Sequence, residues 1–121
     1  MMVYADTSFF ISLINPDDSL HAEAQKLHNK YKGSLETSLL TIAELLVGCE
    51  KRDLDPEIMV SSIYQLTYVS GITLEQALRA AHYMKEKNLS AIDALHASLS
   101  NFEIISSDKD FDKIGVDRIW V

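Results

Sequence analysis

The sequence predicts one α/β domain, residues 1–121, in which helices and a mainly parallel sheet form three layers. Short apolar runs alternate along the chain with segments of helical periodicity, which is the pattern of successive β-α-β units. The length of 121 residues lies in the usual range for one domain. No internal repeat or long linker divides the chain.

The first half of the chain predicts two strands and four helices. The strands are residues 2–5 and 34–38, and the helices are residues 7–15, 20–31, 40–51 and 56–66. Pro16 closes the first helix and Gly33 ends the second. The fourth helix has a strong start, because Asp55 can cap free N–H groups, Pro56 fits the first turn and Glu57 favours the positive end of the helix dipole.

The second half predicts three strands, two helices and one helical turn. The strands are residues 67–72, 103–106 and 117–121, and the helical turn is residues 108–114. Thr73 and Gln76 form a capping-box pattern that opens the first helix, and Ser90 opens the second. The first helix has an apolar face of Leu74, Ala77, Leu78, Ala81 and Met84. The second has an apolar stripe of Ile92, Leu95, Leu99 and Phe102.

The charge balance does not decide the class of partner. Eleven Lys and Arg against eighteen Asp and Glu give a net charge of −7, which on its own counts against nucleic-acid binding. Acids gathered around divalent cations would reverse that sign locally. Nucleic acid therefore stays open as a partner.

Cysteine content and hydropathy exclude several classes of protein. Cys49 is the only cysteine, so the chain has no internal disulfide and no multi-cysteine metal site, and we expect a small buried residue in a helix. No apolar run approaches the roughly 20 residues of a membrane helix. The first residues lack the basic region and cleavage site of a signal peptide, so we expect a cytoplasmic protein.

Two acids follow predicted strands directly. Asp6 comes after residues 2–5, and Asp108 comes shortly after residues 103–106. Ligands of open α/β sheets bind beyond the carboxyl ends of the strands, which makes both carboxylates candidate site residues. Each can also be the N-cap of the helix that follows, and that is the commoner role of a single acid.

Glu44 lies where a solvated acid is not expected. Its neighbours at helical spacing are Leu40, Thr41, Val47 and Gly48, and these residues do not form a charged face. A carboxylate among such residues needs a partner.

Asp93 lies in the first turn of its helix, where it can support the Ser90 cap or belong to a site. His96 follows three residues later on a largely apolar helix. We interpret it as a packed histidine, with contact to Asp93 as the alternative.

Convergence on hard divalent cations would explain all four acids. Mg²⁺ prefers oxygen ligands and binds through a few carboxylates and water, so such a site needs no His or Cys. It would hold a phosphodiester for hydrolysis.

Four short blocks of the sequence resemble, in order and approximate spacing, the acidic blocks of the PIN-domain nucleases. They are "ADTS", "TIAELLVG", "SAIDALHAS" and "ISSDKDF", and the similarity runs from Val3 to about Ile119. The size resembles the single-domain VapC-type toxins of prokaryotic toxin–antitoxin pairs. The resemblance implies a parallel sheet of about five strands between helices, and endonuclease action on RNA that depends on Mg²⁺ or Mn²⁺.

The resemblance also implies roles for particular residues. The acidic metal-site positions are matched by Asp6, Glu44, Asp93 and Asp108. Thr7 or Ser8 matches a small hydroxyl residue that supports the first acid, and Ser106 stands where Thr is commoner. Whether Asp110 joins the site stays open. The acids Asp17, Asp18, Asp53 and Asp55 are expected to lie outside it.

The expected partners follow from the same resemblance. They are an RNA substrate and an antitoxin that brings a basic segment to the acidic pocket. A homodimer is a further candidate, although core packing explains its contact residues Ile58, Ile63 and Tyr64 equally well. Two alternatives remain open: an RNA-processing nuclease outside toxin–antitoxin systems, and a PIN-like module that binds RNA or protein without cutting.

Overall fold

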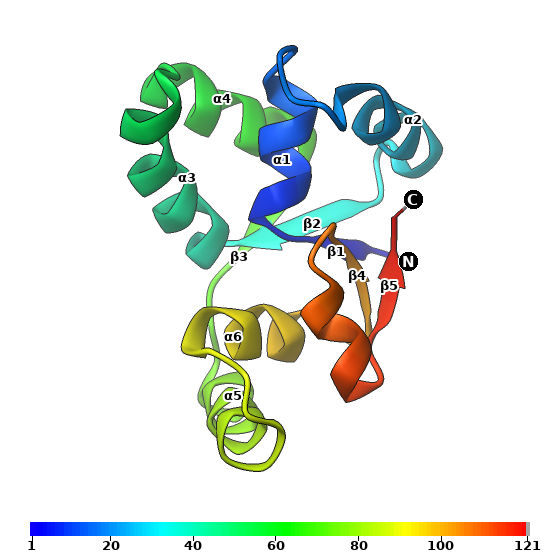
Figure 1. Ribbon diagram of the computed structural model, residues 1–121, viewed down its shortest axis with the longest axis vertical. Coiled ribbons are helices and arrows are strands. Elements are labelled where there is room, and N and C mark those ends of the chain that lie inside the picture. The colour runs from blue at the N-terminus through cyan, green and yellow to red at the C-terminus, as the bar shows by residue number, and fades with distance from the viewer. Residues whose placement is uncertain (121) are drawn as a thin grey trace.

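Five parallel strands form the sheet of the computed structural model, which describes residues 1–120 (Figure 1). Their order is β3-β2-β1-β4-β5, and every neighbouring pair is parallel. The strands are β1 (Val3–Ala5), β2 (Leu35–Ser38), β3 (Tyr68–Ser70), β4 (Glu103–Ile105) and β5 (Asp117–Ile119). This confirms the predicted parallel sheet. Each strand is shorter than its predicted range, because a ladder exists only where a neighbouring strand lies opposite.

Six α-helices and one 3₁₀-helix connect the strands. They are α1 (Thr7–Ile14), α2 (His21–Tyr31), α3 (Leu39–Arg52), α4 (Pro56–Leu66), α5 (Leu74–Lys87), α6 (Ala91–Leu99) and the 3₁₀-helix η1 (Lys109–Ile114). The predicted caps are present: Asp55 accepts from two backbone N–H groups of α4, and Thr73 and Gln76 form a capping box on α5. The predicted strand at 117–121 includes Val121, which lies outside the described residues.

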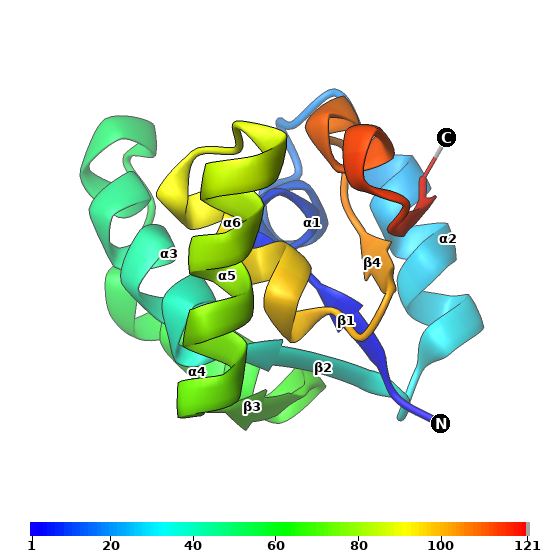
Figure 2. The same ribbon diagram turned by 90° about the horizontal axis from the view of Figure 1, so that it is seen from below.

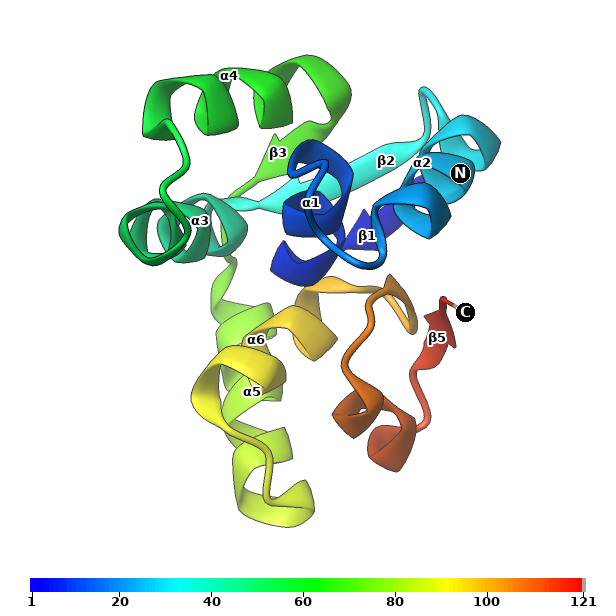
Figure 3. The same ribbon diagram turned by 45° about the horizontal axis from the view of Figure 1, so that its top comes forward.

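Helices cover both faces of the sheet, so the fold has the predicted three layers. On one face, α1 to α4 pack with Val3, Ala5, Leu35 and Ile105 in one core (Figures 1 and 3). On the other face, α6 and η1 pack on Tyr4 and Ile104, and α5 lies beside α6 (Figure 2). Alternate residues of a strand point to opposite faces, which is why Tyr4 leaves the core that holds Val3 and Ala5.

The apolar face predicted for α5 is not buried. Leu74 and Leu78 are 76% and 61% exposed, and Met84 is exposed too, whereas the buried residue of α5 is Ala80. The reason is the position of α5, which packs on α6 rather than on the sheet.

Two further expectations need correction. Helix α6 ends at Leu99, so Phe102 is not part of its stripe; Phe102 is exposed, with a positive φ. Of the candidate dimer contacts on α4, Ile63 is buried in the core, while Ile58 and Tyr64 are exposed. Cys49 is buried in α3, as expected.

No helix within residues 1–120 is both long enough and apolar enough to span a membrane.

Candidate active site

The strand order reverses between β1 and β4, because β2 and β3 extend to one side of β1 while β4 and β5 extend to the other. The crevice beyond the carboxyl ends at such a switch point is the usual ligand site of an open parallel sheet. Asp6 follows β1 at this point, and Ser106 follows β4. The backbone N–H of Asp6 donates to the carbonyl of Ile105 (3.1 Å), so the two strand ends lie side by side.

Asp6 is both the N-cap of α1 and a buried carboxylate at the carboxyl end of β1, with 5% of its surface exposed. Its Oδ1 accepts from the backbone N–H (3.1 Å) and hydroxyl (2.7 Å) of Ser8 and from the N–H of Phe9, and its Oδ2 accepts from Ser106 Oγ (2.6 Å). Burial raises the pKa of this carboxyl, and the hydrogen bonds from Ser106 and Ser8 oppose that rise. The hydroxyl that supports Asp6 on α1 is therefore that of Ser8.

Thr7 supports a different acid. Its Oγ1 donates to Glu44 Oε1 at 2.6 Å, which joins the start of α1 to the half-buried carboxylate of α3. His96 Nε2 lies 2.5 Å from the same oxygen. Desolvation acts to raise the pKa of Glu44, but the hydrogen bonds from His96 and Thr7 outweigh it and leave that pKa below its usual value. Thr7 and His96 therefore supply the partner contacts that the sequence led us to expect for a carboxylate at this position of α3.

His96 is a polar bridge rather than a merely packed side chain. It is 3% exposed, its Nδ1 lies 2.8 Å from the hydroxyl of Tyr4, and that hydroxyl lies 2.9 Å from Ser38 Oγ. The sequence interpretation named Asp93 as the alternative partner, but the ring nitrogens contact Glu44 and Tyr4 instead.

Asp93, Asp108 and Asp110 form a close carboxylate group. One oxygen of each lies within 4.8 Å of the others, and all three residues are half-buried. Desolvation raises the pKa of Asp93, and the charges of Asp108 and Asp110 raise it further, against a hydrogen bond from Ser90. An all-oxygen group in which like charges repel is a fitting site for Mg²⁺ or Mn²⁺.

Local hydrogen bonds fix Asp108 within this carboxylate group. Asp108 is the N-cap of η1, since its Oδ1 accepts from the backbone N–H of Asp110 (2.9 Å). The backbone N–H of Asp108 in turn donates to Ser106 Oγ (2.9 Å). Ser106 therefore links Asp6 to the group, although Asp6 and Glu44 are not members of it. The carboxylate of Asp110, whose place in the site the sequence left open, lies beside those of Asp93 and Asp108.

The other acids named from the sequence are not members of the carboxylate group within the described residues. Asp17 and Asp18 are in the turn between α1 and α2, while Asp53 and Asp55 end α3 and begin α4.

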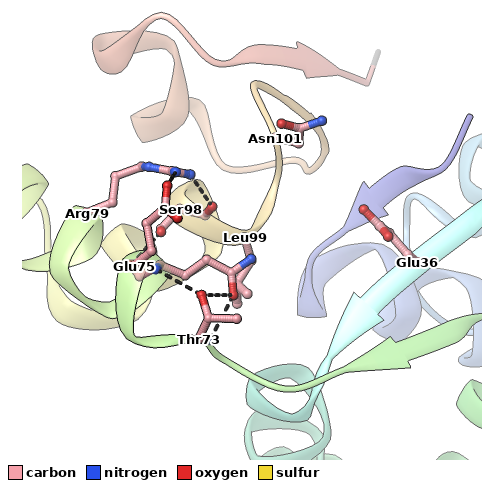
Figure 4. A pocket seen from close by; sticks show the side chains of 8 residues that line it. Glu36, Thr73, Glu75, Arg79, Ser98, Leu99 and Asn101 are labelled. Carbon is pink, nitrogen blue, oxygen red and sulfur yellow. Dashed lines mark hydrogen bonds and ion pairs between the residues drawn. The ribbon is translucent and has the colours of Figure 1, made fainter.

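A polar cavity of about 350 Å³ between β2, α5 and α6 is a separate feature, since none of the candidate acids lines it (Figure 4). Glu36 of β2 lies at one side of it, and burial raises the pKa of its carboxyl. Across from it, Arg79 is held by Glu75 (3.2 Å) and by the carbonyl of Ser98 (3.2 Å).

Comparison with known proteins places the chain in a family. The family model of the PIN domain matches residues 3–117, which is almost the whole chain. The chain is a member of the PIN domain family. No sequence among the curated proteins matches it.

Solved structures share this PIN fold at low sequence identity. VapC20 from Mycobacterium tuberculosis, described as a sarcin–ricin loop cleaving toxin, superposes with a TM-score of 0.85 at 19% identity, over 98% of each chain. A toxin–antitoxin complex from Klebsiella pneumoniae gives 0.79 at 21% identity, over 97% of this chain and 95% of the other. VapBC2 from Rickettsia felis, bound to a DNA fragment from its promoter, gives 0.72 at 16% identity, over 100% of both.

Proposed function

We propose that this PIN domain is a metal-dependent endoribonuclease and the toxin of a VapBC-type toxin–antitoxin pair. The observation that carries the proposal is the group of Asp93, Asp108 and Asp110 carboxylates, within 4.8 Å of one another near the switch point of the sheet. A bound divalent cation would offset the repulsion within such a group. The sequence also assigned Asp6 and Glu44 to the site, and Ser106 and Thr7 hold their carboxylates by hydrogen bonds.

The metal-site acids in this proposal are Asp6, Glu44, Asp93 and Asp108, with Asp110 added on geometric grounds. A divalent ion, Mg²⁺ or Mn²⁺, would supply Lewis-acid chemistry for hydrolysis of a phosphodiester. The chain's own residues hold the ligand oxygens in place: Ser8 and Ser106 orient Asp6, and Thr7 orients Glu44.

The proposed substrate is RNA. One structural relative is described as cleaving the sarcin–ricin loop, which supports an RNA substrate for this chain. Lys109 and Lys113 on η1 stand next to the carboxylate group, and Lys113 already pairs with Asp110 at 3.1 Å. These two ammonium groups are suited to hold the phosphate backbone beside the acids.

The proposed protein partner is an antitoxin, because two of the structural relatives are toxin–antitoxin complexes. The net charge of −7 and the acidic crevice favour a basic segment on that partner. Ile58 and Tyr64, which are exposed on α4, are candidate contacts of a homodimer.

The test is cleavage of a panel of structured RNAs in Mg²⁺, in Mn²⁺ and in EDTA. Wild type and the control Asp17→Asn, an exposed acid outside the crevice, are expected to cut with either metal and not in EDTA. Asp6→Asn is expected to cut at least a hundredfold more slowly. Cutting that persists in EDTA or in Asp6→Asn would contradict the proposal. RNA binding without cutting would favour the binding-module alternative.

A further inference from the structure

A chain of hydrogen bonds leads from the sheet to Glu44. Ser38 Oγ contacts the Tyr4 hydroxyl (2.9 Å), that hydroxyl contacts His96 Nδ1 (2.8 Å), and His96 Nε2 contacts Glu44 Oε1 (2.5 Å). Ser38 and Tyr4 belong to neighbouring strands, whereas His96 lies on α6 and Glu44 on α3. Ser38, Tyr4 and His96 are all buried, so water does not compete for these contacts.

The donors and acceptors of this chain can be assigned from its chemistry. An ionised carboxylate only accepts, so the hydrogen between His96 and Glu44 must belong to Nε2. In the neutral ring Nδ1 then accepts from the Tyr4 hydroxyl, and the Tyr4 oxygen accepts from Ser38. In this assignment each hydrogen bond is donated in the direction from Ser38 to Glu44. No buried donor among these residues lacks an acceptor.

Glu44 receives both of its hydrogen bonds at one oxygen. Thr7 and His96 donate to Oε1, and no hydrogen bond within residues 1–120 uses Oε2. A glutamate has three side-chain torsions, and holding one carboxylate oxygen from two sides removes most of that freedom. Oε2 is thus left without a hydrogen-bond partner within residues 1–120, so it is open to an external ligand.

We propose that His96 is a positioning residue that fixes Glu44 through Nε2, so that Oε2 is presented to a divalent cation. The proposal rests on the proposed function, since it takes Glu44 as a metal ligand. Partners that orient ligand side chains in this way typically change metal affinity by 10–100-fold when they are removed.

Two substitutions separate the Nε2 contact from simple packing. In His96→Gln the amide nitrogen can occupy the position of Nε2 and donate to Glu44. In His96→Asn the shorter amide can reach the position of Nδ1, near Tyr4, but not Glu44. The matched control is His82→Asn, because His82 is an exposed histidine of α5.

The experiment measures Mn²⁺ binding to the purified protein by titration calorimetry, and thermal melting in EDTA. We expect Mn²⁺ to bind at least tenfold more weakly to His96→Asn than to wild type, and within threefold of wild type to His96→Gln and His82→Asn. In a Glu44→Gln background, His96→Asn is expected to have no further effect, because the residue acts through Glu44.

Three results would overturn the inference. They are wild-type Mn²⁺ affinity in His96→Asn, equal weakening in His96→Asn and His96→Gln, and an undiminished effect of His96→Asn in the Glu44→Gln background. If wild type itself bound no Mn²⁺, the metal site and the proposed function would fail together with the inference. If His96→Asn does not fold in EDTA, His96→Met replaces it, because that side chain fills the space of the ring without an N–H group to donate to Glu44. Wild-type Mn²⁺ affinity in His96→Met would equally overturn the inference.

Discussion

The Ser106 hydroxyl donates a 2.6 Å hydrogen bond to Asp6 Oδ2, so the residue after β4 holds the acid after β1. The two residues are 100 positions apart in the chain, and both are buried. Hydrogen bonds to a buried carboxylate are among the stronger ones in proteins. This contact makes Ser106 a structural part of the candidate site.

Ser106→Ala is expected to lower the free energy of unfolding by about 1–3 kcal/mol, because Asp6 Oδ2 loses its buried donor. The measurement is urea unfolding at pH 7 in EDTA. Ser107→Ala is the matched control, since the Ser107 side chain makes no hydrogen bond within residues 1–120. Equal stability of the two variants would show that the Ser106 hydroxyl is not needed to hold Asp6.

Asp93→Asn is expected to raise the melting temperature in EDTA and to reduce the further rise that Mn²⁺ produces in wild type. Desolvation and the charges of Asp108 and Asp110 disfavour the ionised form of Asp93, and the substitution removes that charge. Mn²⁺ stabilises only a folded state that binds it. The measurement is thermal melting in both conditions, with Asp17→Asn as a control that should behave as wild type. A wild type that melts alike in Mn²⁺ and EDTA would count against the metal site.

Cleavage is expected to leave a 5′-phosphate and a 3′-hydroxyl, which are the products when water attacks the phosphorus directly and the 3′-oxygen is the leaving group. A route through the 2′-hydroxyl would instead leave a cyclic phosphate and could not cut a strand that lacks this hydroxyl at the cut site. The measurement is end-group analysis of a cleaved oligoribonucleotide, with and without a 2′-deoxy substitution at that position. Cyclic-phosphate products would refute the predicted mechanism.

An antitoxin that pairs with this chain is expected to inhibit through Arg side chains placed in the acidic crevice. A guanidinium can pair with a carboxylate through two parallel hydrogen bonds and compete with a cation for it. Neutralising the Arg and Lys residues of the antitoxin segment should therefore weaken inhibition, with substitution of its neutral polar residues as the control. Undiminished inhibition would contradict this mode of binding.

Glu36→Gln is expected to stabilise the protein at neutral pH. Burial raises the pKa of Glu36 above its ordinary value, so its contribution to stability is full below that ordinary value and is lost as the pH rises through the raised pKa. The variant should match wild type at pH 4 and exceed its melting temperature at pH 7. The control is Glu86→Gln at an exposed position of α5. A constant difference between wild type and Glu36→Gln across this range would exclude a titration effect.

Much of the fold could be predicted because its signals are local. Asp55 and the Thr73–Gln76 pair mark helix starts within a few residues of sequence, and the structure has caps at both places. The burial of α5 could not be predicted in the same way. Helical spacing shows that Leu74 and Leu78 share a face, but not whether another element covers that face.

The residues of the candidate site also differ in whether local sequence signals could predict them. Asp6 and Asp108 were found because a strand end is visible in the sequence, and the structure brings both strand ends to the switch point. The contacts of His96 were not predicted, since its partners Glu44 and Tyr4 are 52 and 92 positions away along the chain. Only the packing of α6 against α3 and the sheet reveals those contacts.

The position of β1 inside the sheet has a consequence for translation. β1 is made first, but its neighbour β4 lies near the other end of the chain. A nascent chain that has reached α6 has an open edge on β1 and lacks Asp108, Asp110 and the Ser106 that holds Asp6. Chains emerge from the N-terminus. The candidate site of this PIN domain is therefore incomplete until synthesis of the domain is nearly finished.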